Sequence, residues 1–152
     1  MPEFERDFVL RQIRLLAQFV ARIVARARAD GQYASGLEAV RATMEDGLGK
    51  DYPMLRRLDP SSAALLVHDG EVLRTLAWIA AQEGDLLQGA GDPAAAQDLR
   101  RRALALYAEC ADRCPGEAAT CREAARALAA DPELGPLEDK YRRWLGIIPP
   151  DS

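Results

Sequence analysis

The sequence predicts an all-α fold, an antiparallel bundle of about six to eight helices. Alanine supplies 28 of the 152 residues, and aromatic residues make up only 6% of the chain. This composition favours helix over sheet. No segment of useful length alternates between apolar and polar residues, as a half-buried strand would. The length and the 49% hydrophobic content suit one domain. We expect it to span residues 1–146, followed by a tail at 147–152.

The first helix is expected at residues 3–29, a stretch without glycine or proline. Its apolar residues fill about half of a helical wheel, which is more than one neighbouring helix covers. We therefore expect two packing partners within the chain, or a second copy bound to part of the helix. The candidate self-association residues are Phe8, Ile13, Phe19 and Val20. An amphipathic helix lying on a membrane is an alternative, less favoured than core or dimer packing.

Further helices are bounded by glycine, proline and capping residues. Asp30-Gly31-Gln32 ends the first helix, and a second runs from near Ala34 to Gly47–Gly49. Asp59-Pro60 predicts the start of a short helix that continues to Val67. The later helices are expected at 71–88, at 93–113, at 117–130 and from Asp131-Pro132 onward to about residue 146.

The region at about 71–113 resembles a tetratricopeptide (TPR) hairpin. Gly84 matches the glycine of the repeat's first helix, and Gly91-Asp92 matches the turn. Ala96 and Ala103 match the small-residue positions of its second helix. Trp78 and Arg100 depart from the pattern, and only about thirty-four residues fit, as expected of one TPR-like hairpin rather than a solenoid.

The chain as a whole resembles a family of small bacterial all-helical proteins of unknown function. The resemblance is carried by Phe4, Asp7, Phe8, Leu10, Arg11 and Ile13, and by the Gly31–Tyr33 turn. It implies a bacterial origin and a helical fold with a TPR-like hairpin, and it implies no activity.

The sequence lacks the residue motifs that several classes of enzyme require. His68 is the single histidine, so the paired Glu-x-x-His motifs of a di-iron bundle and the His-Glu-x-x-His motif of zinc proteases are both absent. We interpret His68 as a solvated turn residue. We expect no catalytic residue, no bound metal and no cofactor.

The three cysteines lie on apolar helix faces. Cys110 and Cys114 are one helical turn apart, and Cys121 follows on the next helix. We interpret them as small core residues. A redox or disulfide role and a metal site are the alternatives.

Glu83 falls in the middle of an apolar helix face. A carboxylate there requires a partner or a raised pKa. An ion pair with an arginine of a neighbouring helix is the favoured interpretation. A pocket for a small molecule, in a regulatory domain or an enzyme, is the alternative.

The charge pattern does not predict binding to nucleic acid. The formal net charge is −4, and the arginine groups at 56–57, 100–102 and 142–143 are interspersed with acidic residues. Consecutive helical residues point in different directions, so we interpret these arginines as solvated surface. The charged N-terminus does not resemble a secretory signal, and no apolar run approaches the roughly 20 residues of a membrane-spanning helix. We expect a cytoplasmic protein.

These observations favour a non-enzymatic module for protein–protein interaction, with a possible homodimer. Its groove would accept a peptide or a partner helix. The candidate partner-binding residues are Arg74, Trp78 and Gln82, which share one face of the helix at 71–88.

Overall fold

The computed structural model describes the backbone of residues 3–149 and the side chains of residues 8–149. Within that range it contains eight α-helices, two short 3₁₀ turns and no strand. The predicted all-α bundle is therefore confirmed. No helix in this range is long and apolar enough to cross a membrane.

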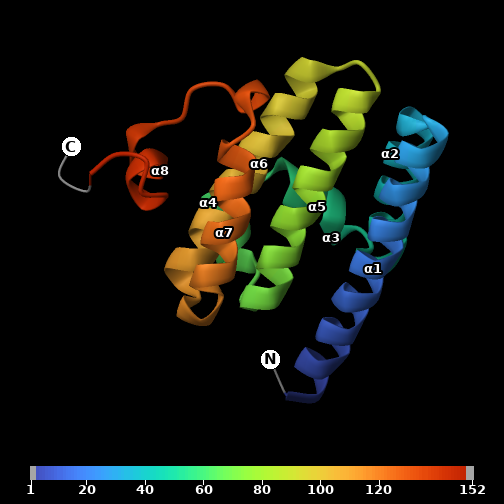
Figure 1. Ribbon diagram of the computed structural model, residues 1–152. Coiled ribbons are helices and arrows are strands. Elements are labelled where there is room, and N and C mark those ends of the chain that lie inside the picture. Colours follow the sequence, from blue (N-terminus) through green and yellow to red (C-terminus); the bar gives the residue numbers. More distant parts are fainter. Residues whose placement is uncertain (1–2, 150–152) are drawn as a thin grey trace.

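Helices α1 (Glu3–Asp30) and α2 (Tyr33–Leu48) form an antiparallel hairpin at one edge of the molecule (Figure 1). Gly31 makes the turn with a φ of 68°, which a glycine adopts without strain. Two glycines of α2 face α1 at close range. A Cβ on Gly36 would lie 2.6 Å from the Cβ of Ala27, and one on Gly47 would overlap a methyl group of Leu16.

Two short helices, α3 (Asp51–Arg57) and α4 (Pro60–Leu66), follow. Helix α4 begins as predicted, because the Asp59 side chain accepts a hydrogen bond from the backbone N–H of Ser62 at 3.1 Å. Helix α3 was not predicted. Its proline, Pro53, lies in the first turn, where the missing N–H would have no helical partner in any case.

The centre of the bundle is the antiparallel pair α5 (Gly70–Gly89) and α6 (Pro93–Arg113), which share the most extensive helix–helix contact (Figure 1). Asp69 and Asp92 cap their N-termini. The helices approach closely at Gly84, where an added Cβ would lie 3.3 Å from the carbonyl oxygen of Ala96. The absence of a side chain at Gly84 therefore allows this close approach of α5 and α6.

The C-terminal part differs from the prediction of one last helix. The turn η1 (Pro115–Glu117) leads into α7 (Ala118–Ala129), which packs on α6. The rest is divided into the turn η2 (Pro132–Leu134) and the short helix α8 (Asp139–Trp144). Gly135, with a φ of 79°, and Pro136 separate them, because neither a positive φ nor a proline continues a helix.

Two main groups of buried apolar side chains lie on different sides of α5. One joins α1, α2 and α5 with Tyr52 of α3, and the other joins α4, α5, α6, α7 and the C-terminal turns. Trp78 packs against both groups. It therefore lies where the two halves of the core meet.

Candidate functional site

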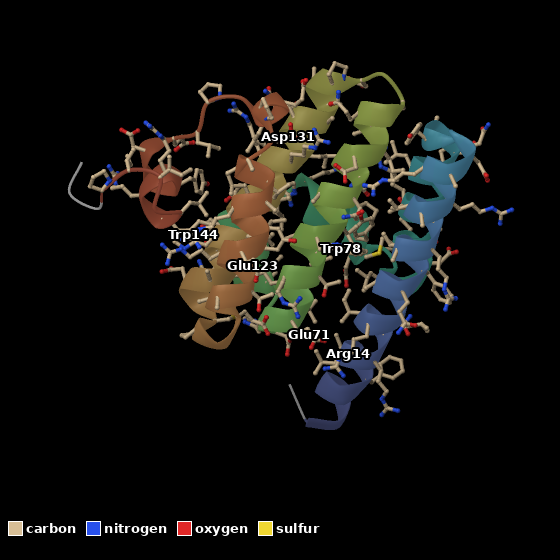
Figure 2. The ribbon with its side chains drawn as sticks, viewed as in Figure 1. Arg14, Glu71, Trp78, Glu123, Asp131 and Trp144 are labelled. Atoms are coloured by element: carbon tan, nitrogen blue, oxygen red, sulfur yellow. The ribbon has the colours of Figure 1, made fainter. Side chains whose placement is uncertain are left out.

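A groove runs over Trp78, between α1 and α7. It encloses about 490 Å³ and is mostly apolar. Ala17, Gln18 and Ala21 of α1 line one wall, and Thr120 and Ala124 of α7 line the other. We call this the Trp78 groove. Figure 2 shows the Trp78 side chain between α1 and α7, the helix that carries Glu123.

The floor of the Trp78 groove comes from α5 and α6. Arg74, Thr75 and Trp78 of α5 lie along it, together with Tyr107 of α6. Trp78 is half-buried, so its ring is supported by the core and still accessible from the groove. A supported aromatic ring in a concave apolar surface is typical of the anchor point of a binding site.

Tyr107 adds a polar group to this floor. Its side chain is only 4% exposed, and burial raises its pKa to about 12. Among the described residues its hydroxyl has no hydrogen-bond partner. The hydroxyl is not among the buried polar atoms that lack a partner, so water can hydrogen-bond to it from the groove. A ligand in the groove would take the place of that water as the hydrogen-bond partner.

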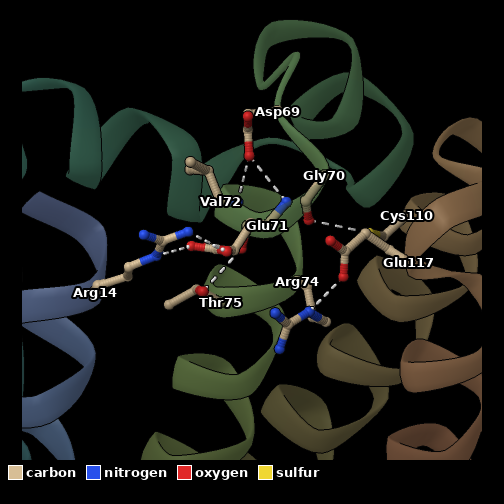
Figure 3. A network of polar contacts seen from close by, with 9 residues as sticks. All are labelled: Arg14, Asp69, Gly70, Glu71, Val72, Arg74, Thr75, Cys110 and Glu117. Atoms are coloured by element: carbon tan, nitrogen blue, oxygen red, sulfur yellow. Dashed lines mark hydrogen bonds and ion pairs between the residues drawn. The ribbon is translucent and has the colours of Figure 1, made fainter. Parts of the chain in front are cut away.

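One end of the groove is fixed by a polar network (Figure 3). Arg74 donates to Glu117 at 2.7 Å, and Arg14 makes two hydrogen bonds to Glu71, at 2.7 and 2.9 Å. The hydrogen bonds from Arg14 lower the pKa of the Glu71 carboxyl. These pairs link α5 to α1 and to η1, the turn that leads into α7.

Two of the three predicted partner-binding residues line this groove. Arg74 and Trp78 contribute to its floor, whereas Gln82, one turn further along α5, is half-buried but does not line it. Tyr107 and the alanines of α1 and α7 were not among the residues predicted from the sequence. These residues line the groove because α1, α6 and α7 pack around α5. The spacing of residues within α5 alone does not predict that packing.

The predicted self-association residues fall into two pairs. Ile13 and Val20 are 1% and 0% exposed and belong to the core between α1, α2 and α5. Phe8 and Phe19 are 63% and 41% exposed. A second copy can therefore contact the second pair, while Ile13 and Val20 contribute to the stability of the chain itself.

Glu83 is buried and has the kind of partner that the sequence analysis favoured. Its carboxylate is 1% exposed and accepts a hydrogen bond from the Tyr52 hydroxyl at 2.9 Å. Arg56 and Arg41 lie 3.6 and 3.9 Å from its oxygens. Burial, followed by the nearby Glu83 charge, strongly raises the pKa of Tyr52. Glu83 thus joins α5 to α2 and α3.

A cavity of about 60 Å³ adjoins Glu83 and is lined in part by Tyr52, Arg56 and Arg102. Arg102 donates to the carbonyl oxygens of Leu55 and Leu58. A cavity of this size has room for a few water molecules. Sites for metabolites are usually about 300–1,000 Å³.

The cysteines lie together at the junction of α6 and α7. Cys110 and Cys121 are buried, and the Cys110 thiol donates to the carbonyl oxygen of Gly70 at 3.3 Å. The hydrogen bond with Cys121, together with burial, strongly raises the pKa of Cys110. Such a thiol stays protonated at neutral pH and is a poor nucleophile.

A larger cleft, of about 810 Å³, is lined by Cys114, His68, Asp69, Glu71 and Glu117, among others. Its carboxylates already serve the fold. Asp69 caps α5, and the other two accept hydrogen bonds from Arg14 and Arg74. His68 is exposed. Across the described residues, no group of three or more His, Cys, Asp or Glu side chains is arranged to hold a metal ion.

The arginine triplet at 100–102 is solvated surface only in part, because Arg101 is exposed whereas Arg102 is half-buried. Arg100 is buried and pairs with Asp85 and Asp131, at 2.8 and 3.3 Å. Arg101 and Arg102 donate to backbone carbonyl oxygens. These guanidinium groups connect helices and turns. A run of charged residues in a sequence does not show whether its side chains make such contacts or only face the solvent.

The chain matches no family model, no curated protein and no solved structure. The resemblances to the TPR hairpin and to the bacterial helical family therefore remain predictions.

Proposed function

We propose that this protein is a non-enzymatic interaction module that binds an amphipathic helix of a partner protein in the Trp78 groove. The observation that carries the proposal is an open apolar groove whose floor holds both an accessible tryptophan and the unpaired Tyr107 hydroxyl. The apolar part would provide affinity, and the hydroxyl would favour one register of the bound segment.

The walls favour a helix as the bound segment. Ala17 and Ala21 on α1 and Thr120 and Ala124 on α7 have short side chains, which allow another helix to approach closely. No strand is present among residues 3–149, so an extended peptide would find no sheet edge to join there. We therefore expect a partner helix with one large apolar residue against Trp78 and a hydrogen-bonding group near Tyr107.

A small-molecule site at Glu83 has weaker support. Its carboxylate already has a tyrosine and two arginines around it, and the adjoining cavity is about an eighth of the groove's volume. The proposal of a bacterial, cytoplasmic protein rests on the resemblance and on the composition alone.

The test uses a displayed library of amphipathic helical peptides, selected for binding to the full chain. We expect Trp78→Ala to weaken the selected peptides by about 30-fold or more, the usual cost of losing a tryptophan anchor. Tyr107→Phe should weaken them by roughly fivefold, the value of one hydrogen bond. Fluorescence anisotropy with labelled peptides measures both effects.

The matched control adds the same bulk inside and outside the groove. Ala21→Arg, on the α1 wall, should abolish binding, whereas Ala42→Arg, on an exposed part of α2, should leave it unchanged. Equal affinity for the wild type, Trp78→Ala and Ala21→Arg would disprove the proposal.

A further inference from the structure

The outer face of α1 carries a row of exposed apolar side chains that the Trp78 groove does not use. Phe8, Leu15 and Phe19 are 63%, 45% and 41% exposed. At 100° per residue they lie within about 40° of one another on the helix. We call this row the α1 ridge. Large apolar side chains gathered on one face mark a contact surface more often than single exposed ones do.

A shallow groove of about 440 Å³ runs beside the α1 ridge, toward α2. Its lining includes Leu16, Phe19 and Ile23 of α1 and Thr43 and Gly47 of α2. Gly47 lets the end of α2 lie directly on Leu16. A ridge and a groove side by side on one face are self-complementary in shape, as an interface between identical copies requires.

Charges of opposite sign flank the ridge. On the helical wheel the backbone positions of Arg11 and Arg22 fall on the side of the ridge away from α2, and Asp46 of α2 lies on the other side. The side chains of Arg22 and Asp46 both reach the lining of the groove. Arg22 sits 6.0 Å from the Phe19 ring centre. Neither Arg22 nor Asp46 forms an ion pair within the described part of the chain. Both charges are therefore available to a partner.

We propose that the α1 ridge binds a second copy of this chain, with the two α1 helices parallel. A two-fold axis along α1 places Arg22 of each copy against Asp46 of the other. An axis across α1, with antiparallel helices, would instead bring the arginine-bearing sides together, where like charges repel. Charge complementarity thus selects both the occupant and its orientation.

Sedimentation velocity on the full chain, from about 1 µM to about 300 µM, tests the association in the range expected of a small interface. We expect a concentration-dependent dimer that Leu15→Glu weakens at least tenfold, because the charge enters the apolar contact. Ala25→Glu adds the same charge to an exposed position of α1 outside the ridge and should not weaken it. Circular dichroism checks that each variant is folded. A monomer at every concentration, or a dimer unaffected by Leu15→Glu, overturns the proposal.

The orientation is tested by mixing two charge variants. Arg22→Glu and Asp46→Arg should each dimerise less than the wild type, since each copy then meets a like charge on its partner. Mixed together they should form heterodimers, because the two introduced charges are opposite and face each other, while the native Arg22 of one copy faces the native Asp46 of the other. Failure of the mixture to dimerise better than either variant alone contradicts the parallel arrangement.

Discussion

Glu83 shows at the level of one residue how a buried charge can hold helices together. The carboxylate takes a hydrogen bond from Tyr52 and lies between Arg41 and Arg56, whose side chains are about one-third exposed. An arginine partner could be predicted from the sequence, because a buried carboxylate needs compensation. The tyrosine could not, since the helix that positions it contains Pro53 and was not expected.

Removing this carboxylate should destabilise the fold. We expect Glu83→Gln to lower the free energy of unfolding by about 2–4 kcal/mol, since two arginines then lack their counter-charge, a cost reduced by their contact with water. Tyr52→Phe should cost about 1 kcal/mol. Urea unfolding of the two variants and of the double variant measures both effects. Additive effects would show that Tyr52 and Glu83 are not coupled.

The Arg14–Glu71 pair predicts a pH dependence. Hydrogen bonds from Arg14 lower the folded-state pKa of Glu71 below its usual 4.5. The stabilisation is therefore present above pH 4.5 and is lost as the pH falls through the folded-state pKa. We expect the melting temperature of Glu71→Gln to fall less than that of the wild type on acidification. Equal slopes below pH 4.5 would contradict this role.

At the level of the elements, small residues set the distances between helices. Gly36 and Gly47 bring α2 close to α1, but they face different obstacles. An added Cβ on Gly36 meets the Cβ of Ala27, which has no side-chain torsion that could relieve the contact, whereas one on Gly47 meets the end of the Leu16 side chain. The two positions therefore form a matched pair.

Replacing both glycines in turn separates helix propensity from packing. An alanine in a helix gains roughly 1 kcal/mol over glycine, and overpacking costs about 1–3 kcal/mol. We expect Gly36→Ala to destabilise the protein and Gly47→Ala to have a smaller effect, because Leu16 can change rotamer. The melting temperatures of the two variants, compared with that of the wild type, test this expectation. A more stable Gly36→Ala would show that α1 and α2 can separate without cost.

Helix boundaries were predictable where local chemistry defines them. Asp59 caps α4 where Asp59-Pro60 predicts a helix start, and α6 begins at Pro93 as expected. The last helix was wrong because an apolar stripe continues across Gly135 and Pro136, although the backbone cannot remain helical there. The apolar spacing shows which side chains face the core. The same spacing can continue across a break in the helix, so it does not locate the break.

For the whole molecule, α1 is the element that connects the two proposed surfaces. One side of it forms a wall of the Trp78 groove, and its outer face carries the α1 ridge. The residue pattern of α1 predicts a helix with more apolar surface than one neighbouring helix covers. The pattern does not show which of these residues are buried and which belong to the ridge, because Ile13, Val20, Phe8 and Phe19 are all strongly hydrophobic. Only the positions of α2 and α5 bury the first two and leave the other two exposed.

The most direct test of the proposed function is to locate a selected helical peptide on the full chain by hydrogen–deuterium exchange and amide chemical shifts. The account predicts perturbations at the residues that line the Trp78 groove, which disappear in Trp78→Ala: Ala17, Gln18 and Ala21 of α1, Arg74, Thr75 and Trp78 of α5, and Thr120 and Ala124 of α7. Perturbations confined to the α1 ridge, or to the residues around Glu83, would contradict it.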